Sequence, residues 1–263
     1  MTALQAICFG LIQGLTELLP VSSSAHLILL PWVFRWPDPG LAFDVSLHIG
    51  TLVAVLAYFY RDVIRLTRDF FGALQGQREP QHQLPLKLIV ATVPGALIGL
   101  AFEKQAETLF RSPLLIAGSL TALGLLLFFA DNNKRERSDL THLSWMQAIL
   151  IGLSQGLAII PGVSRSGITI SVALLLGLER EAAVRFSFYL SIPIICGAGL
   201  LKSHVFLTHS GDPLFWMGLL TAAVSGYAAI RFLMNFVKTK SFTPFVVYRV
   251  LLSLFILSYY FLK

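Results

Sequence analysis

The stretch GLTELLPVSSSAHL (Gly14–Leu27) places a carboxylate, three serines and a histidine inside an otherwise apolar segment. Glu17 is the only charged side chain in residues 1–34. Pro20 disfavours the helical conformation for the preceding Leu19, so we expect one short helix to end here and a second to begin in the serine run. The stretch therefore predicts a broken helix with a polar turn.

The composition around this stretch is typical of a protein that crosses a membrane several times. Of the 263 residues, 56% are hydrophobic and 13% are charged, whereas a soluble domain carries roughly 25% charged residues. The net charge of +6 does not indicate nucleic-acid binding, because Lys and Arg lie in short loops between apolar runs. Six apolar stretches approach the roughly 20 residues that span a bilayer core. They are 43–60, 86–102, 113–130, 186–201, 213–234 and 244–262.

Two further apolar stretches are interrupted near their centres. Residues 3–33 are broken by Pro20, Pro31 and the serine run, and residues 145–178 are broken by PGVSRSG (Pro161–Gly167). Interrupted backbone at membrane depth must be covered by protein or line a wet cavity. Each stretch therefore predicts a re-entrant hairpin of two short helices that leaves the membrane on the side it entered.

The two interrupted stretches resemble each other. GLIQGLTELLPVSSS (Gly10–Ser24) and GLSQGLAIIPGVSRS (Gly152–Ser166) share eight of fifteen residues at an offset of 142, which indicates an internal repeat. Each half then holds one hairpin and three spans, so the second half starts on the opposite side of the membrane. We predict one all-α membrane domain over residues 1–263, with six transmembrane helices and two hairpins. Its inverted-repeat halves are about 1–130 and 131–263.

Basic residues predict the orientation of this domain. One side receives eleven of them and the other side five, which places the first side in the cytoplasm. The eleven are Arg61, Arg65, Arg68, Arg78, Lys134, Arg135, Arg137, Arg180, Arg185, Lys238 and Lys240, and the five are Arg35, Lys104, Arg111, Lys202 and Lys263. We therefore expect both termini on the outer side of the plasma membrane, with the hairpin turns meeting near its midplane.

The two halves differ in charge at these turns. Glu17 aligns with Ile159, and Arg165, the only charged residue in 141–178, aligns with Ser23. A charge inside a membrane is costly and indicates a functional site with a partner. A purely structural Glu17–Arg165 pair is the simpler interpretation, but it does not account for the hydroxyls and the imidazole nearby.

Those neighbouring groups predict a site for a phosphate. Two helix N-termini facing one cavity attract an anion, and the planar guanidinium of Arg165 suits phosphate oxygens. Further hydroxyl donors are Ser22, Ser23, Ser164, Ser166 and Thr169, although a single serine in such a place is more often a helix cap. Because a carboxylate repels phosphate, Glu17 predicts a divalent cation between them, Mg²⁺ or Ca²⁺. His26, three residues after Ser23, is expected on the same helical face, where it could accept a proton from Ser23 or from water.

These residues resemble the undecaprenyl-diphosphate phosphatase family, also called bacitracin-resistance proteins. QGLTELLPVSSSAH is similar to the first signature of that family, and PGVSRSGIT is similar to the second. The resemblance extends over nearly the whole chain through FDVSLHIGTLVAV (Phe43–Val55), FSFYLSIPIICGA (Phe186–Ala198) and FVVYR (Phe245–Arg249).

The resemblance implies an enzyme that hydrolyses a C55 polyprenyl diphosphate to the monophosphate. This reaction recycles the lipid carrier of the bacterial cell wall and confers bacitracin resistance. By position, Glu17 and residue 13 are implied as the metal-linked pair, and Ser23 and His26 as the nucleophile and its base or acid. The implied phosphate-binding residues are Ser164, Arg165, Ser166 and Thr169. Many family members have Glu where this chain has Gln13, which supplies no second charged ligand.

Several alternatives stay open at this point. Attack through a phosphoserine on Ser23 and direct attack by water both fit the sequence. A secondary transporter or flippase of a lipid phosphate or another anion is the main alternative function, because inverted repeats and broken helices are common in transporters. A non-catalytic membrane scaffold is a third. The expected partners are the prenyl diphosphate substrate and membrane lipids, and a homodimer stays open.

Overall fold

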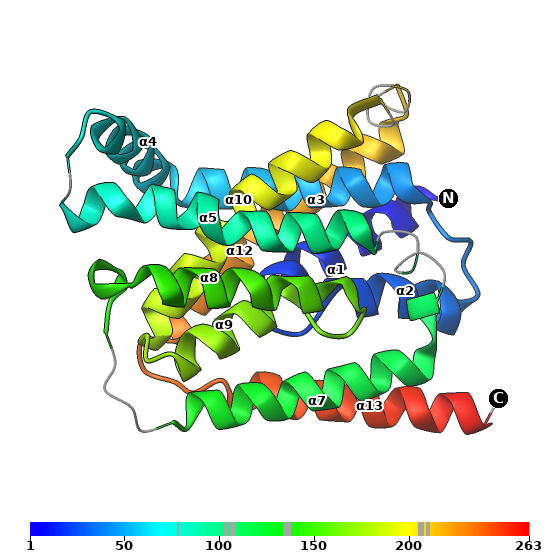
Figure 1. The fold of residues 1–263 in the computed structure, drawn as a ribbon. Coiled ribbons are helices and arrows are strands. Elements are labelled where there is room, and N and C mark those ends of the chain that lie inside the picture. The colour runs from blue at the N-terminus through cyan, green and yellow to red at the C-terminus, as the bar shows by residue number, and fades with distance from the viewer. Residues whose placement is uncertain are drawn as a thin grey trace.

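The computed structural model describes residues 1–77, 79–102, 105, 109–133, 138–204, 208 and 211–262. The regular elements in these residues are helices (Figure 1), which confirms the predicted all-α class. The α-helices are α1 (Ala3–Leu18), α2 (Ser23–Phe34), α3 (Leu41–Tyr58), α4 (Tyr60–Leu74), α5 (Pro80–Ala101), α7 (Pro113–Asp131), α8 (Trp145–Ser154), α9 (Arg165–Leu175), α10 (Arg180–Leu201), α12 (Pro213–Phe236) and α13 (Thr243–Leu262). Short 3₁₀ turns are η1 (Leu109–Arg111), η2 (Leu140–His142) and η3 (Gln155–Ile159).

The long helices coincide with the six predicted apolar stretches. Within the described residues, α5, α7, α10, α12 and α13 are long and apolar enough to cross a membrane. A sixth crossing is obtained when α3 and α4, which are bent by 82° relative to each other, are taken as one broken span. Both termini lie at the same end of the helix bundle (Figure 1), as an even number of crossings requires. The exact number of crossings and the inverted arrangement of the halves stay predictions.

Six of the basic residues used to predict the orientation lie outside the described residues. They are Arg78, Lys104, Lys134, Arg135, Arg137 and Lys263. The other ten lie on described helices or on the turns between them, so the prediction of orientation still depends on the whole set.

Helix α4 was not predicted, because the sequence places the end of a span and the start of a polar insert there. Its exposed apolar residues, Tyr60, Ile64, Phe71 and Leu74, recur at helical spacing along one stripe, and Arg61, Arg65 and Arg68 lie beside that stripe. A search for long apolar runs misses such a helix, because polar and apolar residues alternate along it. Its composition is typical of a helix that lies in the membrane interface.

The first interrupted stretch folds as the pair α1 and α2. Helix α1 ends at Leu18, and Leu19 is extended with φ −80° and ψ 148°, as expected for a residue before proline. Helix α2 begins at Ser23, inside the expected serine run. The prediction that Pro31 also interrupts the stretch was wrong, since α2 continues through it to Phe34. A proline removes a single intrahelical hydrogen bond, and packing around α2 compensates, because Trp32 lies edge-on to Tyr259 with ring centroids 4.6 Å apart.

The second interrupted stretch folds in the same way. Helix α8 and turn η3 run to Ile159, and α9 begins at Arg165, inside the interrupting segment PGVSRSG (Pro161–Gly167). Ser164, the N-cap of α9, has a φ of 71°, and Ser22, the N-cap of α2, has a φ of 74°. The Ser22 hydroxyl accepts a bond from the Ala25 amide at 3.4 Å, and the Ser164 hydroxyl accepts one from the Gly167 amide at 3.1 Å. The turns before the two helices therefore share one local geometry.

The repeated glycines explain why the two hairpins can be placed deep in the bundle. A Cβ atom on Gly14 would lie 2.5 Å from the Ala222 oxygen, and one on Gly152 would lie 2.3 Å from the Ala91 oxygen. Helix α1 thus packs backbone to backbone on α12, and α8 packs in the same way on α5. Close packing through small residues is typical of helices in membranes.

A fully buried guanidinium joins the two turns. Arg249 of α13 donates from Nη1 to the Pro20 oxygen at 3.1 Å, and from Nη2 to the Gly162 oxygen at 2.7 Å and the Val163 oxygen at 3.2 Å. Its Nε donates to the Leu120 oxygen at 3.0 Å. The turn carbonyls have no helical partner, so a buried donor must satisfy them. Arg249 is therefore the residue that holds the turns of both hairpins at one point.

Replacing Arg249 by lysine should destabilise the protein strongly. A single ammonium cannot reach carbonyls of α7 and of both turns at once, and each buried carbonyl left without a donor costs about 1–3 kcal/mol. Thermal unfolding in detergent should show a clearly lower Tm for Arg249→Lys. Arg231→Lys, the same change at an exposed position of α12, is the matched control. Equal Tm values for the two variants would contradict this role of Arg249.

Candidate active site

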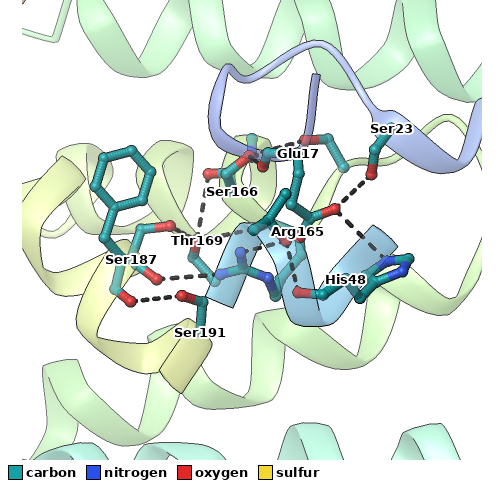
Figure 2. Close-up of polar contacts among 12 residues, drawn as sticks. Glu17, Ser23, His48, Arg165, Ser166, Thr169, Ser187 and Ser191 are labelled. Carbon is teal, nitrogen blue, oxygen red and sulfur yellow. Dashed lines mark hydrogen bonds and ion pairs between the residues drawn. The ribbon is translucent and has the colours of Figure 1, made fainter. Parts of the chain in front are cut away.

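The polar residues of both hairpins converge on the Glu17 carboxylate at the end of α1 (Figure 2). Arg165, the first residue of α9, donates from Nη2 to Glu17 Oε1 at 3.2 Å. Ser23, the first residue of α2, donates from Oγ to Glu17 Oε2 at 2.5 Å. Because interrupted backbone separates each pair of short helices, residues far apart in the chain meet here. The structure thus brings together the anion and the cation that the repeat alignment singled out.

A cavity of about 470 Å³ opens beside this pair. Its polar lining from the two hairpins consists of Glu17, Ser23, Ser24, Gln155, Ser164 and Arg165, and α3 and the end of α10 add Asp44, His48 and Lys202. Its other walls are mainly apolar and include Val45 and Ile49 of α3, Ile159 of η3, and Ile194, Ile195 and Ala198 of α10. The cavity therefore combines charged groups from both hairpins with largely apolar walls, and its volume is in the range of roughly 300–1,000 Å³ typical of ligand sites.

Two helix N-termini face the cavity. The lining residues Ser23 and Ser24 open α2, and Arg165 opens α9 directly after Ser164. The first N–H groups of a helix have no intrahelical acceptor and carry partial positive charge. The two helix N-termini of the predicted anion site therefore lie at one cavity, and anion binding there stays a prediction.

The Arg165 guanidinium is held in place from two sides. Besides its bond to Glu17, Nη1 donates to the Ser187 oxygen of α10 at 3.1 Å. Among the described contacts, these two bonds use two of the five N–H donors of an arginine. The remaining donors of a guanidinium that lines the cavity are available for a ligand.

The structure does not bring all the predicted phosphate-binding hydroxyls to the cavity. Ser164 lines it, but Ser22, Ser166 and Thr169 are fully buried and bonded within the protein. The Ser166 hydroxyl donates to the Glu17 backbone oxygen at 3.1 Å, with the Leu19 oxygen at 3.3 Å. The Ser22 hydroxyl accepts a bond from the Gly162 amide at 3.1 Å. These hydroxyls join one hairpin to the other.

Thr169 is directed away from the cavity for a similar reason. Its hydroxyl donates to the Arg165 backbone oxygen at 2.8 Å and lies 2.7 Å from the Ser187 hydroxyl. Thr169 therefore fixes the first turn of α9 against α10 and supports the position of Arg165 (Figure 2).

The expected contact between Ser23 and His26 is absent from the described structure. His26 Nδ1 lies 2.7 Å from the Ser22 oxygen, and Nε2 lies 2.6 Å from the Tyr248 hydroxyl of α13. The His26 and Tyr248 rings are stacked with centroids 5.7 Å apart. Three residues of separation on a helix leave an angle of about 60° between side chains. That angle is enough to direct Ser23 to Glu17 and His26 to α13.

Sequence reasoning missed another histidine that lies at the site. His48 Nε2 is 3.7 Å from Glu17 Oε2, and its Nδ1 is 2.9 Å from the Asp44 backbone oxygen. Asp44 and His48 both line the cavity from α3. The signal available in the sequence was that Asp44 and His48 are polar residues four positions apart in an apolar span. Nothing in the local pattern linked that face of α3 to the hairpins, because the link is made by tertiary packing.

Gln13 lies beside Glu17, as the predicted pair requires. It is fully buried, and its Nε2 donates to Glu17 Oε2 at 3.4 Å. In the described part of the chain its Oε1 has no hydrogen-bond partner. Gln155, the equivalent residue of the second repeat, donates to the Ala91 oxygen at 3.2 Å, and its Oε1 also has no partner there. An unpartnered acceptor next to a carboxylate suits an oxygen ligand for a cation.

Comparison with known proteins gives a consistent result. Residues 6–255 match the family described as bacitracin resistance protein BacA. The chain is 54% identical over 263 residues to undecaprenyl-diphosphatase from Moorella thermoacetica, with 100% of both chains covered. It is 48% identical over 257 residues to undecaprenyl-diphosphatase from Geotalea daltonii, with 95% of each chain covered. It is 47% identical over 270 residues to the protein of that name from Geobacter sulfurreducens, with 100% of both covered.

Ser166→Ala should lower stability because the Ser166 hydroxyl serves two turn carbonyls. Leaving them without a donor costs about 1–3 kcal/mol, so thermal unfolding in detergent should give a lower Tm. Ser24→Ala removes a half-buried hydroxyl that lines the cavity and should leave Tm nearly unchanged. A normal Tm for Ser166→Ala would show that this serine does not hold the hairpins together.

Proposed function

The chain belongs to the bacitracin resistance protein BacA family, and from this premise we propose that it hydrolyses undecaprenyl diphosphate to undecaprenyl phosphate and inorganic phosphate. It is a multi-pass membrane phosphatase that regenerates a cell-wall lipid carrier and so counteracts bacitracin. The observation that carries the proposal is the cavity, which is lined by Glu17, Ser23 and Arg165 of the hairpins and by apolar residues of α3 and α10.

The two parts of the cavity match the two parts of such a substrate. The donors of Arg165 and the N-termini of α2 and α9 can bind the diphosphate oxygens. The apolar residues of α3 and α10 can contact the first isoprene units of the chain. A substrate held at both ends is oriented for reaction at phosphorus, which is a large part of what an enzyme contributes to rate.

We propose that a divalent cation, Mg²⁺ or Ca²⁺, binds at Glu17 with the oxygen of Gln13. The support is the buried, unpartnered Oε1 of Gln13 beside the carboxylate. No group of three or more His, Cys, Asp or Glu residues converges in the described residues. An ion here would therefore take its remaining ligands from hydroxyls, water or the phosphates, which is usual for Mg²⁺. Bound there, it would neutralise charge on the phosphate oxygens.

Ser23 and His26 have different proposed roles. The Ser23 hydroxyl faces the cavity and is oriented by Glu17, so it is placed either to attack phosphorus or to donate a bond to a phosphate oxygen. His26 contacts the Ser22 oxygen and the Tyr248 hydroxyl instead. We therefore assign His26 to positioning the first turn of α2, on which Ser23 lies.

The position of the cavity supports access from the outer face. Two of its lining residues, Asp44 near the start of α3 and Lys202 directly after α10, belong to the end of the bundle at which both termini lie. With the predicted orientation, this end is outside the cell. The carrier diphosphate is left outside when the cell-wall polymer is extended, so the cavity would open to the leaflet in which the substrate is produced.

Phosphate release from undecaprenyl diphosphate by the detergent-purified protein tests the function directly. We expect release by the wild type, loss of release in EDTA, and recovery with Mg²⁺ or Ca²⁺. Arg165→Lys should release phosphate about 10²–10³-fold more slowly, because a point charge cannot replace the planar donor pair. Arg231→Lys is the matched control.

A transporter or flippase would give a different pattern in that assay. It would bind the substrate without releasing phosphate in detergent, where there is no second compartment. Near-normal release by Arg165→Lys would instead limit Arg165 to a structural counter-ion of Glu17, and full release in EDTA would overturn the proposed cation.

Site-directed labelling tests the orientation. In a variant without Cys8 and Cys196, single cysteines at Gln77 and Asn133 should react with an impermeant reagent only from the cytoplasmic side. Cysteines at Asp38 and Asp212 should react only from outside, because the basic residues place their loops there. The reverse pattern would overturn both the orientation and access from the outer leaflet.

A further inference from the structure

We propose that His48 is a ligand of the divalent cation at Glu17, so that the ion is shared between His48 Nε2 and Glu17 Oε2. This inference deepens the proposed function, because it names a ligand of the cation placed there. It rests on the geometry of α3 against the first hairpin and on the two hydrogen bonds that orient the imidazole and the Gln13 amide.

The separation of the two atoms fits a shared ion. Nε2 of His48 and Oε2 of Glu17 are 3.7 Å apart (Figure 2). Imidazole nitrogens lie about 2.0–2.1 Å from a bound Zn²⁺ ion, and ligand oxygens lie about 2.0–2.6 Å from Mg²⁺ or Ca²⁺. Two such bonds can span slightly more than the observed separation, so an ion can lie between these atoms with the backbone as it is. The side chain of His48 is 40% exposed and lines the cavity, which provides a path for the ion.

The hydrogen bond of His48 Nδ1 determines the orientation of the imidazole ring towards Glu17. Nδ1 lies 2.9 Å from the Asp44 backbone oxygen, which can only accept a hydrogen bond, so Nδ1 carries the proton. When the ring is neutral, its Nε2 therefore has a lone pair that is directed towards a carboxylate oxygen. Ligating histidines usually donate their other N–H to a carbonyl or carboxylate in this way, which fixes the tautomer and the ring orientation.

Three groups at or beside the first hairpin can offer a lone pair to a cation. They are the Nε2 lone pair of His48, Oε2 of Glu17, and Oε1 of Gln13, which is buried and unpartnered among the described residues. A proton on Nε2 would make His48 and Glu17 an ion pair. It would leave Oε1 of Gln13 without a partner. Glu17 Oε2 already accepts a bond from Ser23 Oγ at 2.5 Å, whereas a cation would give Gln13 Oε1 a partner and would bind the lone pair of His48 Nε2. Gln13 is neutral, so Glu17 is the one charged ligand that the first hairpin offers. His48 would add a further ligand from α3.

An imidazole ligand has a consequence for which metal binds well. Mg²⁺ and Ca²⁺ prefer oxygen ligands, whereas imidazole suits later first-row ions, and Mn²⁺ accepts both kinds of ligand. His48 should therefore favour Mn²⁺ over Ca²⁺. Replacing it with glutamine, which can offer a carbonyl oxygen, should shift the preference back towards Ca²⁺.

Pulsed electron paramagnetic resonance with Mn²⁺ tests the ligand without relying on activity. The detergent-purified full chain would be loaded with less than one equivalent of Mn²⁺, and nitrogen modulation of the electron spin echo would be recorded. We expect the ¹⁴N modulation of a coordinated imidazole in the wild type and its loss in His48→Gln, with Mn²⁺ binding weakened about 10–100-fold. His142→Gln, the same change at a 76% exposed histidine of η2, should keep both the modulation and the affinity.

Each other outcome overturns the inference in a recognisable way. Modulation that persists in His48→Gln assigns the nitrogen to another residue. Wild-type binding of Mn²⁺ without ¹⁴N modulation, or equal affinity in the two proteins, leaves His48 as an ion-pair partner of Glu17. These results do not affect the phosphatase itself, because metal-dependent phosphate release by the wild type is measured separately. If the wild type releases no phosphate, the proposed function is wrong, whatever the electron spin echo of the bound Mn²⁺ shows.

Discussion

The structure depends on one buried interaction, the contact of the Arg249 guanidinium with the backbone carbonyls of both hairpin turns. A chain that breaks its helices at membrane depth exposes peptide groups that lipid cannot satisfy. Arg249 has donors in a fixed planar arrangement, so one side chain from α13 serves Pro20 on one turn and Gly162 and Val163 on the other. The hydroxyls of Ser22 and Ser166 add direct bonds between the hairpins. These few groups therefore supply hydrogen bonds to backbone groups of both turns.

The site follows from this arrangement. Once the turns are held together, the residues that open α2 and α9 face one cavity, and the charged residue of each hairpin lies next to that of the other. Glu17 and Arg165 pair at 3.2 Å, and buried ions are tolerated only when they are paired and hydrogen-bonded. The pair is also open to a cavity, which a structural ion pair does not require. The same interrupted helices thus provide both the anion-attracting N-termini and the access that a phosphorylated lipid needs.

The serines of the two motifs have divided roles that their similar sequences conceal. Ser22 and Ser164 are equivalent in the repeat and share a left-handed φ and a capping bond. Their neighbours differ, since Ser23 contacts Glu17 at the cavity whereas Ser166 binds backbone oxygens of the other hairpin. The two turns have the same backbone geometry but carry different side chains. One hairpin can therefore contribute the carboxylate of Glu17 and the other the guanidinium of Arg165 to a single site.

The sequence by itself determined the features that depend on local chain chemistry. Apolar length predicted the long helices, Pro20 and the serine run predicted the first turn, and the two motifs indicated the family and the Glu17–Arg165 pair. Tertiary structure alone decided which side chain meets which. It directed His26 to Tyr248 of α13, brought His48 of α3 to Glu17, and placed Arg249 between the turns. The physical reason is that the direction of a side chain on a helix acquires meaning only when another helix packs against that face, and each of these partners comes from a distant part of the chain.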